Sequence, residues 1–228
     1  MKTDKYNIKS TRAYIFDYGG TLDTGGYHWS DAIWQAYQDV GVPVCESAFR
    51  EAYVAVERRL GAEPFISPDF SFRQTLELKL QLQMQQMDCI PFVPAVLERL
   101  YAQTLTHTSH SREVLRRLAL EKPLALVSNF YGNLTTVLRE MQLDDLFCCV
   151  VESATVGVRK PDSRIFELAL QILRLPAEQV AVVGDSWKND IQPAASLGCT
   201  TVWLQPAQGM APIVPDATFV INDLDELL

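Results

Sequence analysis

Short apolar segments alternate with helix-forming segments along the second half of the chain, and this alternation restricts the fold more than any other feature. Each apolar segment has the length of a buried strand. Predicted strands cover residues 124–128, 148–152, 180–185, 200–204 and 217–221, and predicted helices cover 112–118, 133–142, 161–173 and 190–197. Apolar strands joined by helices are typical of a parallel sheet with helices on both faces. The sequence therefore predicts an α/β fold with a doubly wound parallel sheet.

The first half of the chain follows a different pattern. One apolar strand, AYIF at 13–16, comes first, and apolar residues then recur at helical spacing from about residue 27 to residue 106. Ser71 and Gln74 have the spacing of a capping box. Gly41 and Gly61 are predicted to end the first two of these helices. The four helices are predicted to begin near Ser30, Ser47, Ser71 and Pro94.

These two patterns predict a split core with an inserted domain. We expect an α/β core made of residues 1–24 and 107–228, and an all-helical cap made of residues 25–106. The polar segment that contains His107 and His110 is predicted to form the hinge between them.

Composition excludes several classes of protein. The chain has 28 acidic and 20 basic residues, a net charge of −8, so it lacks the positive charge of a protein that binds nucleic acid by neutralising phosphates. No apolar stretch approaches the roughly 18 residues of a membrane span, and the charged N-terminal segment lacks the apolar part of a secretory signal. The five cysteines include no C-x-x-C pair. We predict a cytoplasmic protein without a nucleic-acid or membrane partner.

Polar residues follow the predicted core strands where each strand ends. In an open parallel sheet the carboxyl ends of the strands border one crevice, so residues far apart in sequence can meet there. Any one of them alone is more typical of a turn, a helix cap or a solvated surface than of a catalytic site. The set comprises Asp17 with Thr21, Ser128 with Asn129, Lys160, and Asp185 with Asp190.

Together these residues would suit phosphoryl transfer. Asp17 and Asp185 offer the oxygen ligands that Mg²⁺ prefers. The Ser128 hydroxyl and the Lys160 ammonium group are donors for phosphate oxygens. A carboxylate held beside a phosphate that binds a metal is a candidate nucleophile, which would form an aspartyl-phosphate.

Four segments resemble the motifs of the haloacid dehalogenase (HAD) superfamily: FDYGGTLD, VSN, RKPD and GDSWKND, in this order. The helical insertion resembles the cap of the type I subgroup. The resemblance implies that Asp17 is the nucleophile, that Ser128 and Lys160 bind the transferring phosphoryl group, and that Asp185 ligates Mg²⁺. It further implies supporting roles for residues around them. Asp190 would support the waters of the metal or pair with Lys160, the Gly19 carbonyl would face Mg²⁺, and Thr21, Gly20 and Asn129 would hold the nucleophile loop and the substrate.

One position departs from the phosphatase pattern. Phosphatases of this superfamily carry a second aspartate two residues after the nucleophile, as general acid and base, and this chain has Gly19 there. Such acid–base help is typically worth about 10²–10⁴-fold in rate. We therefore expect a slow or specialised Mg²⁺-dependent phosphatase acting on a small phosphorylated metabolite.

Two alternatives remain open at this stage. One is different chemistry: phosphonatases of the superfamily also have a small residue at this position and use a cap lysine, but Lys79 is predicted to lie on the surface. A dehalogenase is disfavoured because dehalogenases of the superfamily typically lack the metal-binding aspartates of the fourth motif, whereas this chain has both Asp185 and Asp190. The other is a catalytically weak phosphate-binding or regulatory protein. Trp29 and Trp34 are predicted either to line the pocket or to pack inside the cap.

Overall fold

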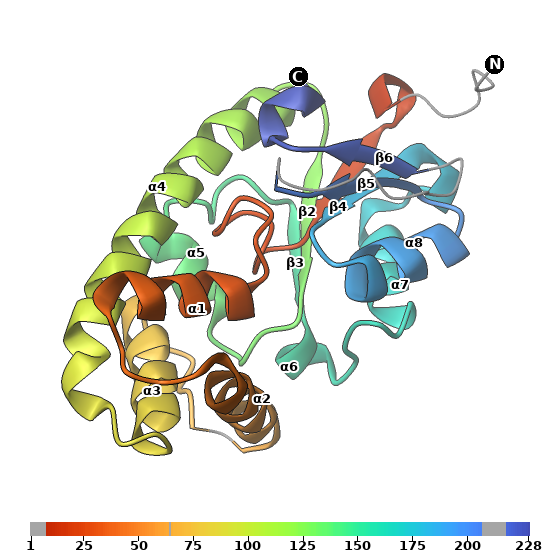
Figure 1. Ribbon diagram of the computed structural model, residues 1–228. Coiled ribbons are helices and arrows are strands. Elements are labelled where there is room, and N and C mark those ends of the chain that lie inside the picture. The colour runs from red at the N-terminus through yellow and green to blue at the C-terminus, as the bar shows by residue number, and fades with distance from the viewer. Residues whose placement is uncertain (1–7, 64, 207–217) are drawn as a thin grey trace.

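A single six-stranded parallel sheet forms the centre of the protein (Figure 1). The computed structural model describes residues 8–63, 65–206 and 218–228. Within these residues the strand order is β3-β2-β1-β4-β5-β6, and every neighbouring pair is parallel. The predicted doubly wound sheet is thus confirmed. The strands are β1 (Ala13–Phe16), β2 (Leu124–Ser128), β3 (Cys149–Glu152), β4 (Val180–Gly184), β5 (Thr200–Leu204) and β6 (Thr218–Ile221).

The register of the central strands brings the motif residues to one edge of the sheet. Phe16 at the end of β1 lies beside Leu126 of β2 and Val183 of β4. Asp17 follows Phe16 directly, and its N–H donates to the Val183 carbonyl at 2.9 Å. Because Ser128 lies only two residues beyond Leu126, the strand ends that carry the motifs emerge side by side.

Helices cover both faces of the sheet. On one face, the side chains of Ile15 and Val182 pack against α7 (Arg164–Leu173) and α8 (Gln192–Ser196). On the other face, Phe16 and Leu126 pack against α5 (Leu134–Glu140) and the C-terminal half of α4 (Val93–Ala119). Alternate residues of each strand therefore face opposite layers, which explains why the strands read as continuous apolar runs. The short helix α6 (Ser153–Val156) follows β3.

Helices α1 (Trp29–Val40), α2 (Glu46–Ala62) and α3 (Phe72–Gln85) form the inserted helical layer together with the N-terminal half of α4 (Figure 1). The capping box at Ser71 and Gln74 is present, and Gly41 ends α1 in the left-handed conformation, as predicted. Three expected boundaries are displaced by one or two residues. His28, not Ser30, caps α1, because its ring accepts the Ser30 N–H; α2 begins at Glu46 and continues past Gly61 to Ala62.

The predicted hinge at residues 107–110 is also wrong, since α4 is one uninterrupted helix from Val93 to Ala119. Its polar residues are compatible with a helix because their hydroxyls bond to the helix itself or to the core. The Thr108 hydroxyl donates to the Thr104 carbonyl at 2.8 Å, and the Ser111 hydroxyl donates to the Leu22 carbonyl at 2.8 Å. The division into a core of 1–24 plus 107–228 and a cap of 25–106 stays a prediction. Residues 1–7 and 207–217 of that core lie outside the described residues.

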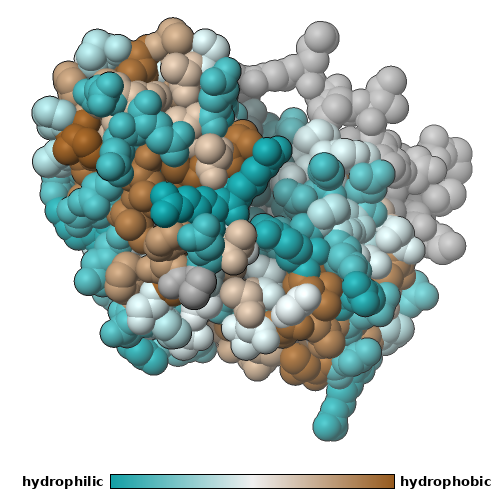
Figure 2. All heavy atoms as spheres, turned by 90° about the horizontal axis from the view of Figure 1, so that it is seen from below, coloured by the Kyte–Doolittle hydropathy of each residue, from teal (hydrophilic) through white to brown (hydrophobic). Residues whose placement is uncertain are grey.

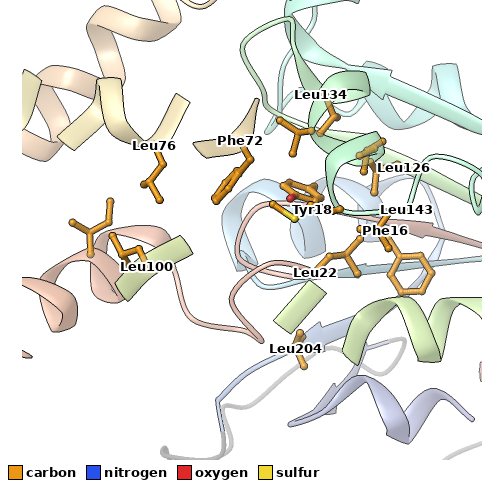
Figure 3. Packing of buried hydrophobic residues seen from close by; sticks show 14 of the residues in the cluster. Phe16, Tyr18, Leu22, Phe72, Leu76, Leu100, Leu126, Leu134, Leu143 and Leu204 are labelled. Atoms are coloured by element: carbon orange, nitrogen blue, oxygen red, sulfur yellow. The ribbon is translucent and has the colours of Figure 1, made fainter. Parts of the chain in front are cut away.

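A single apolar cluster runs from the sheet into the helical layer (Figure 3). It begins with Phe16 on β1, continues through Tyr18 and Leu22 in the loop after β1, and reaches Phe72 and Leu76 on α3. The loop that follows β1 is therefore packed between the two layers.

The outer surface differs from this interior. The face seen from below carries hydrophilic atoms across its middle, with apolar areas on either side (Figure 2). Large exposed apolar side chains come from separate elements, for example Val54, Leu120 and Ile172. Among the described residues, no helix has the length and apolar character needed to cross a bilayer. The remaining short segments are the 3-10 turns Ile8–Ser10, Ile90–Phe92, Ala177–Gln179 and Leu224–Leu227, and a π-helical turn at Trp187–Ile191.

Candidate active site

The Asp17 carboxylate is the centre of a buried polar cluster at the carboxyl edge of the sheet. It lies at the end of β1 and is only 6% exposed. Its Oδ1 accepts hydrogen bonds from the Ser128 hydroxyl at 3.0 Å and from the Lys160 Nζ at 2.5 Å. Residues 111 and 143 positions away in sequence thus meet Asp17, as the sequence predicted from the parallel topology.

Lys160 bridges two carboxylates. Its Nζ lies 2.5 Å from Asp17 Oδ1 and 2.6 Å from Asp190 Oδ1. Burial acts against its charge, but the two carboxylates outweigh burial and raise the pKa of Lys160 above its usual value. The Asn129 side chain donates to the Lys160 carbonyl at 2.9 Å and accepts from its N–H at 2.8 Å. Asn129 therefore fixes the backbone of Lys160, and both polar atoms of the Asn129 side chain are engaged in that contact.

Asp185 is held at its main chain and at its side chain. The Thr21 hydroxyl accepts the Asp185 N–H at 3.0 Å and lies 3.3 Å from its Oδ1. The indole N–H of Trp203 donates to the Asp185 carbonyl at 2.7 Å. Trp203 is a contact that sequence reasoning missed, because nothing in the pattern of β5 distinguishes this tryptophan from a core residue.

The cluster contains more negative than positive charge. Oxygens of Asp17, Asp185 and Asp190 all lie within 4.8 Å of one another, whereas Lys160 supplies one positive charge. Burial and the neighbouring carboxylates raise the pKa of Asp185 well above its usual value. Burial also raises the pKa of Asp190, to about 6. Asp17 and Asp185 offer hard carboxylate oxygens, the ligands that Mg²⁺ prefers, and the excess of negative charge around them suits a divalent cation, so these residues fit that ion.

Two glycines shape the loop between Asp17 and Thr21. Gly20 has φ of 98°, and a Cβ built on it would lie 2.4 Å from Asp185 Oδ2, so only glycine fits there. Gly19 is different. A Cβ built on it would meet the indole of Trp29 at 3.7 Å, an ordinary contact distance. The place where the superfamily resemblance expects an acidic side chain is thus bordered by Trp29.

Asp23 is a buried acid in the same loop to which the sequence analysis assigned no role, although it ends the FDYGGTLD segment. Its Oδ1 accepts the Gly20 N–H at 2.7 Å, and its Oδ2 accepts the Trp29 indole N–H at 2.9 Å. Burial raises the pKa of Asp23 to about 7. Asp23 thus ties the loop to Trp29. Trp34, in contrast, packs against Phe49 inside the helical layer, with ring centroids 5.3 Å apart.

Lys79 is buried, which corrects the prediction that it lies on the surface. Its side chain is 10% exposed, and its Nζ lies 2.6 Å from Glu57 Oε1. Its Nζ donates to the Tyr131 hydroxyl at 3.2 Å, and that hydroxyl donates to Glu57 Oε2 at 2.6 Å. Lys79 comes from α3, Glu57 from α2 and Tyr131 from the loop after β2, so the contact joins the two layers. Helical periodicity did not indicate it, because the partner charge lies on a different helix.

A buried carboxylate, held by a serine and a lysine beside further acids at the carboxyl edge of a doubly wound sheet, is typical of an enzyme that transfers phosphoryl groups. A family model for haloacid dehalogenase-like hydrolases matches residues 11–198. The chain belongs to this family, and it is a phosphatase-like hydrolase. It is 30% identical to phosphoglycolate phosphatase of Vibrio cholerae over 97% of each chain.

Solved structures agree on the fold. A dehalogenase structure matches 96% of this chain and 96% of its own length, with a TM-score of 0.64 and 20% identity. A haloacid dehalogenase-like family hydrolase from Xanthomonas campestris matches 96% of this chain and 89% of its own, with a TM-score of 0.57 and 17% identity. At these identities the likeness shows the fold alone.

Proposed function

We propose that this protein is a Mg²⁺-dependent hydrolase of small phosphate monoesters that forms an aspartyl-phosphate on Asp17. The observation that carries the proposal is the placement of the Asp17 carboxylate between the Ser128 hydroxyl, the Lys160 ammonium group and Asp185. Asp17 and Asp185 would hold the ion, together with the Gly19 carbonyl. When bound, Mg²⁺ would neutralise part of the phosphoryl charge and orient the phosphate.

The proposed reaction has two steps, and in each of them one bond to phosphorus forms while another breaks. One Asp17 oxygen forms a bond to phosphorus while the bond from phosphorus to the leaving-group oxygen breaks. Water then attacks phosphorus and the bond to Asp17 breaks, which releases inorganic phosphate and restores the carboxylate. Ser128 and Lys160 donate hydrogen bonds to the phosphoryl oxygens, and Asp190, which pairs with Lys160 at 2.6 Å, orients that donor.

The leaving group must find its proton elsewhere. Gly19 provides no acid, and both oxygens of the neighbouring Asp23 already accept hydrogen bonds, from Gly20 and Trp29. Loss of general acid help costs about 10²–10⁴-fold in rate. The proposed hydrolase is therefore slow on leaving groups that depart as alkoxides, and faster on leaving groups that need no proton.

The burial of Lys79 brings a second candidate forward, a phosphonatase-like hydrolase with an amine nucleophile in the cap. A nucleophilic amine must lose its proton. Burial alone would lower the pKa of Lys79, but Glu57 outweighs burial and raises that pKa above its usual value. Because this ion pair keeps Lys79 protonated, the contact favours phosphate ester hydrolysis over an imine at Lys79.

Binding of beryllofluoride, a phosphoryl mimic, tests the site. We expect Mg²⁺-dependent binding to the wild-type protein by calorimetry and loss of binding in Asp17→Asn. Asp145→Asn is the matched control: it removes an exposed carboxylate from the surface of the predicted α/β core and should keep binding. Phosphate release from a panel of small phosphate esters then tests turnover. Binding without turnover on any ester would favour the non-catalytic alternative, and no binding at all would refute the proposed site.

A further inference from the structure

Trp203 lies in β5, outside the four motif segments that supply the proposed active site. We propose that Trp203 is a positioning residue for the cation. Its indole N–H holds Asp185 in place before the ion binds, and this restraint makes the site select Mg²⁺ over larger divalent ions. The inference rests on the proposed function and adds to it a residue that none of the motifs contains.

Both peptide groups that flank the Cα of Asp185 are held by side chains. On the amino side, the Asp185 N–H donates to the Thr21 hydroxyl at 3.0 Å. On the carboxyl side, the Trp203 indole N–H donates to the Asp185 carbonyl at 2.7 Å. With both planar peptide groups fixed, the direction of the Cα–Cβ bond is fixed as well. Asp185 follows β4, which lies between β1 and β5, so the two restraints reach it from both neighbouring strands.

The Trp203 indole is free to make this contact because it does not fill the core. Val202 and Leu204, its neighbours in β5, belong to the apolar cluster that contains residues of α4 and α5. Successive side chains of a strand point to opposite faces, so Trp203 points away from that cluster. Its half-buried ring packs instead against Trp187, with centroids 5.1 Å apart. Trp187 lies two residues after Asp185, so the indole contacts the loop after β4 at two places.

A restraint on Asp185 matters because negative charge is concentrated around it. Oxygens of Asp17, Asp185 and Asp190 lie within 4.8 Å of one another. The Lys160 Nζ pairs with Asp17 at 2.5 Å and with Asp190 at 2.6 Å, and these are its ion pairs among the described residues. Repulsion therefore drives the Asp185 carboxylate away from the other two when no cation is bound. The hydrogen bond from Trp203 opposes that movement, so the site needs less reorganisation to bind an ion.

The restraint should affect the binding of Mg²⁺ more than that of Ca²⁺. Mg²⁺ requires near-ideal octahedral geometry with oxygen ligands at about 2.0–2.1 Å, whereas Ca²⁺ accepts flexible arrangements at about 2.3–2.6 Å. A carboxylate that occupies several positions can bind Ca²⁺ in many of them and Mg²⁺ in few. The fixed position of Asp185 is thus expected to set the preference between the two ions.

Trp203→Phe tests the inference, because it removes the N–H and keeps an aromatic ring beside Trp187. Calorimetric titration without substrate gives Kd for Mg²⁺ and for Ca²⁺. We expect Kd for Mg²⁺ to rise by about three- to tenfold, the range for one lost hydrogen bond, and Kd for Ca²⁺ to rise by less than about twofold. Trp187→Phe is the matched control. It removes an indole N–H that makes no described hydrogen bond, and it should change neither Kd.

The two ions together distinguish positioning from general destabilisation. Equal increases in both Kd values would mean that the variant loosens the whole site, and unchanged values in a Trp203→Phe protein folded by circular dichroism would mean that the indole only packs. Either result overturns the inference. If Trp203→Phe does not fold, Trp203→Val removes the same N–H with a side chain that suits a strand, and failure of both to fold would show that the indole serves the fold instead. A wild-type protein that binds no Mg²⁺ refutes the proposed function itself.

Discussion

Replacing Gly19 with aspartate is the sharpest test of the proposed chemistry, because it restores the side chain that phosphatases of the family use as acid and base. The backbone and the nearest neighbours of Gly19 leave room for a Cβ. Gly19 does not have the left-handed backbone that disfavours a side chain, and the nearest atoms to its would-be Cβ are Trp29 Cδ1 and Nε1, both at 3.7 Å. The neighbouring acids Asp17 and Asp23 favour the protonated form of a new carboxyl group, which is the form that donates a proton.

The expected gain depends on the leaving group. General acid help of about 10²–10⁴-fold corresponds to about 3–5 kcal/mol of barrier. We expect kcat of Gly19→Asp to rise by about 10²-fold on an alkyl phosphate such as glycerol 3-phosphate. On p-nitrophenyl phosphate, whose leaving group is a stable anion, the gain should stay below about tenfold. Steady-state phosphate release with both substrates, at saturating Mg²⁺, measures the two values.

Gly19→Asn is the matched control for this experiment. Asparagine has nearly the shape of aspartate and no proton to transfer at neutral pH, so the alkyl phosphate rate should not rise. Equal gains in Gly19→Asn and Gly19→Asp would mean that the side chain acts by filling space beside Trp29. An unchanged or lower rate in a folded Gly19→Asp protein would refute the argument that the missing acid limits the reaction.

Two further predictions concern stability. Gly20→Ala should lower the free energy of unfolding by about 1–3 kcal/mol in urea titrations and weaken Mg²⁺ binding, because its Cβ would lie 2.4 Å from Asp185 Oδ2 at φ of 98°. Gly19→Ala is the control, since a Cβ fits there, and it should change neither quantity by much. Equal losses in the two variants would contradict the reasoning. Since burial raises the pKa of Asp23 from 3.8 to about 7, its contribution to stability is greatest below about pH 4 and falls as pH rises to about 7. The loss of unfolding free energy is up to about 4 kcal/mol. Urea unfolding at pH 5 and at pH 7.5 measures it: the unfolding free energy should differ less between the two pH values in Asp23→Asn than in the wild type. The same difference in both proteins would exclude Asp23 as the source.

Much of the fold could be predicted because local patterns carry it. The apolar runs at β2, β4 and β5 and the capping box at Ser71 are properties of neighbouring residues, and the structure has them. The failures have the same origin. The segment 107–110 looks polar and hinge-like in sequence, but its helix is stabilised by hydroxyl contacts and by packing against the core, as the Ser111 bond to Leu22 shows. Packing between distant segments overrides the local signal there.

By itself, the sequence determined the class of fold and the residues that gather around Asp17, because strands that alternate with helices must present their carboxyl ends at one edge. Only the tertiary structure decided which side chains of the cap helices pack near the residues around Asp17 and which pack against one another. It buried Lys79 against Glu57 and placed the Trp29 indole beside Gly19. The physical reason is that a strand end is set by backbone hydrogen bonds within the sheet, whereas the contacts of a cap helix depend on how one helix packs against others, and sequence periodicity shows which face is apolar but not what that face meets.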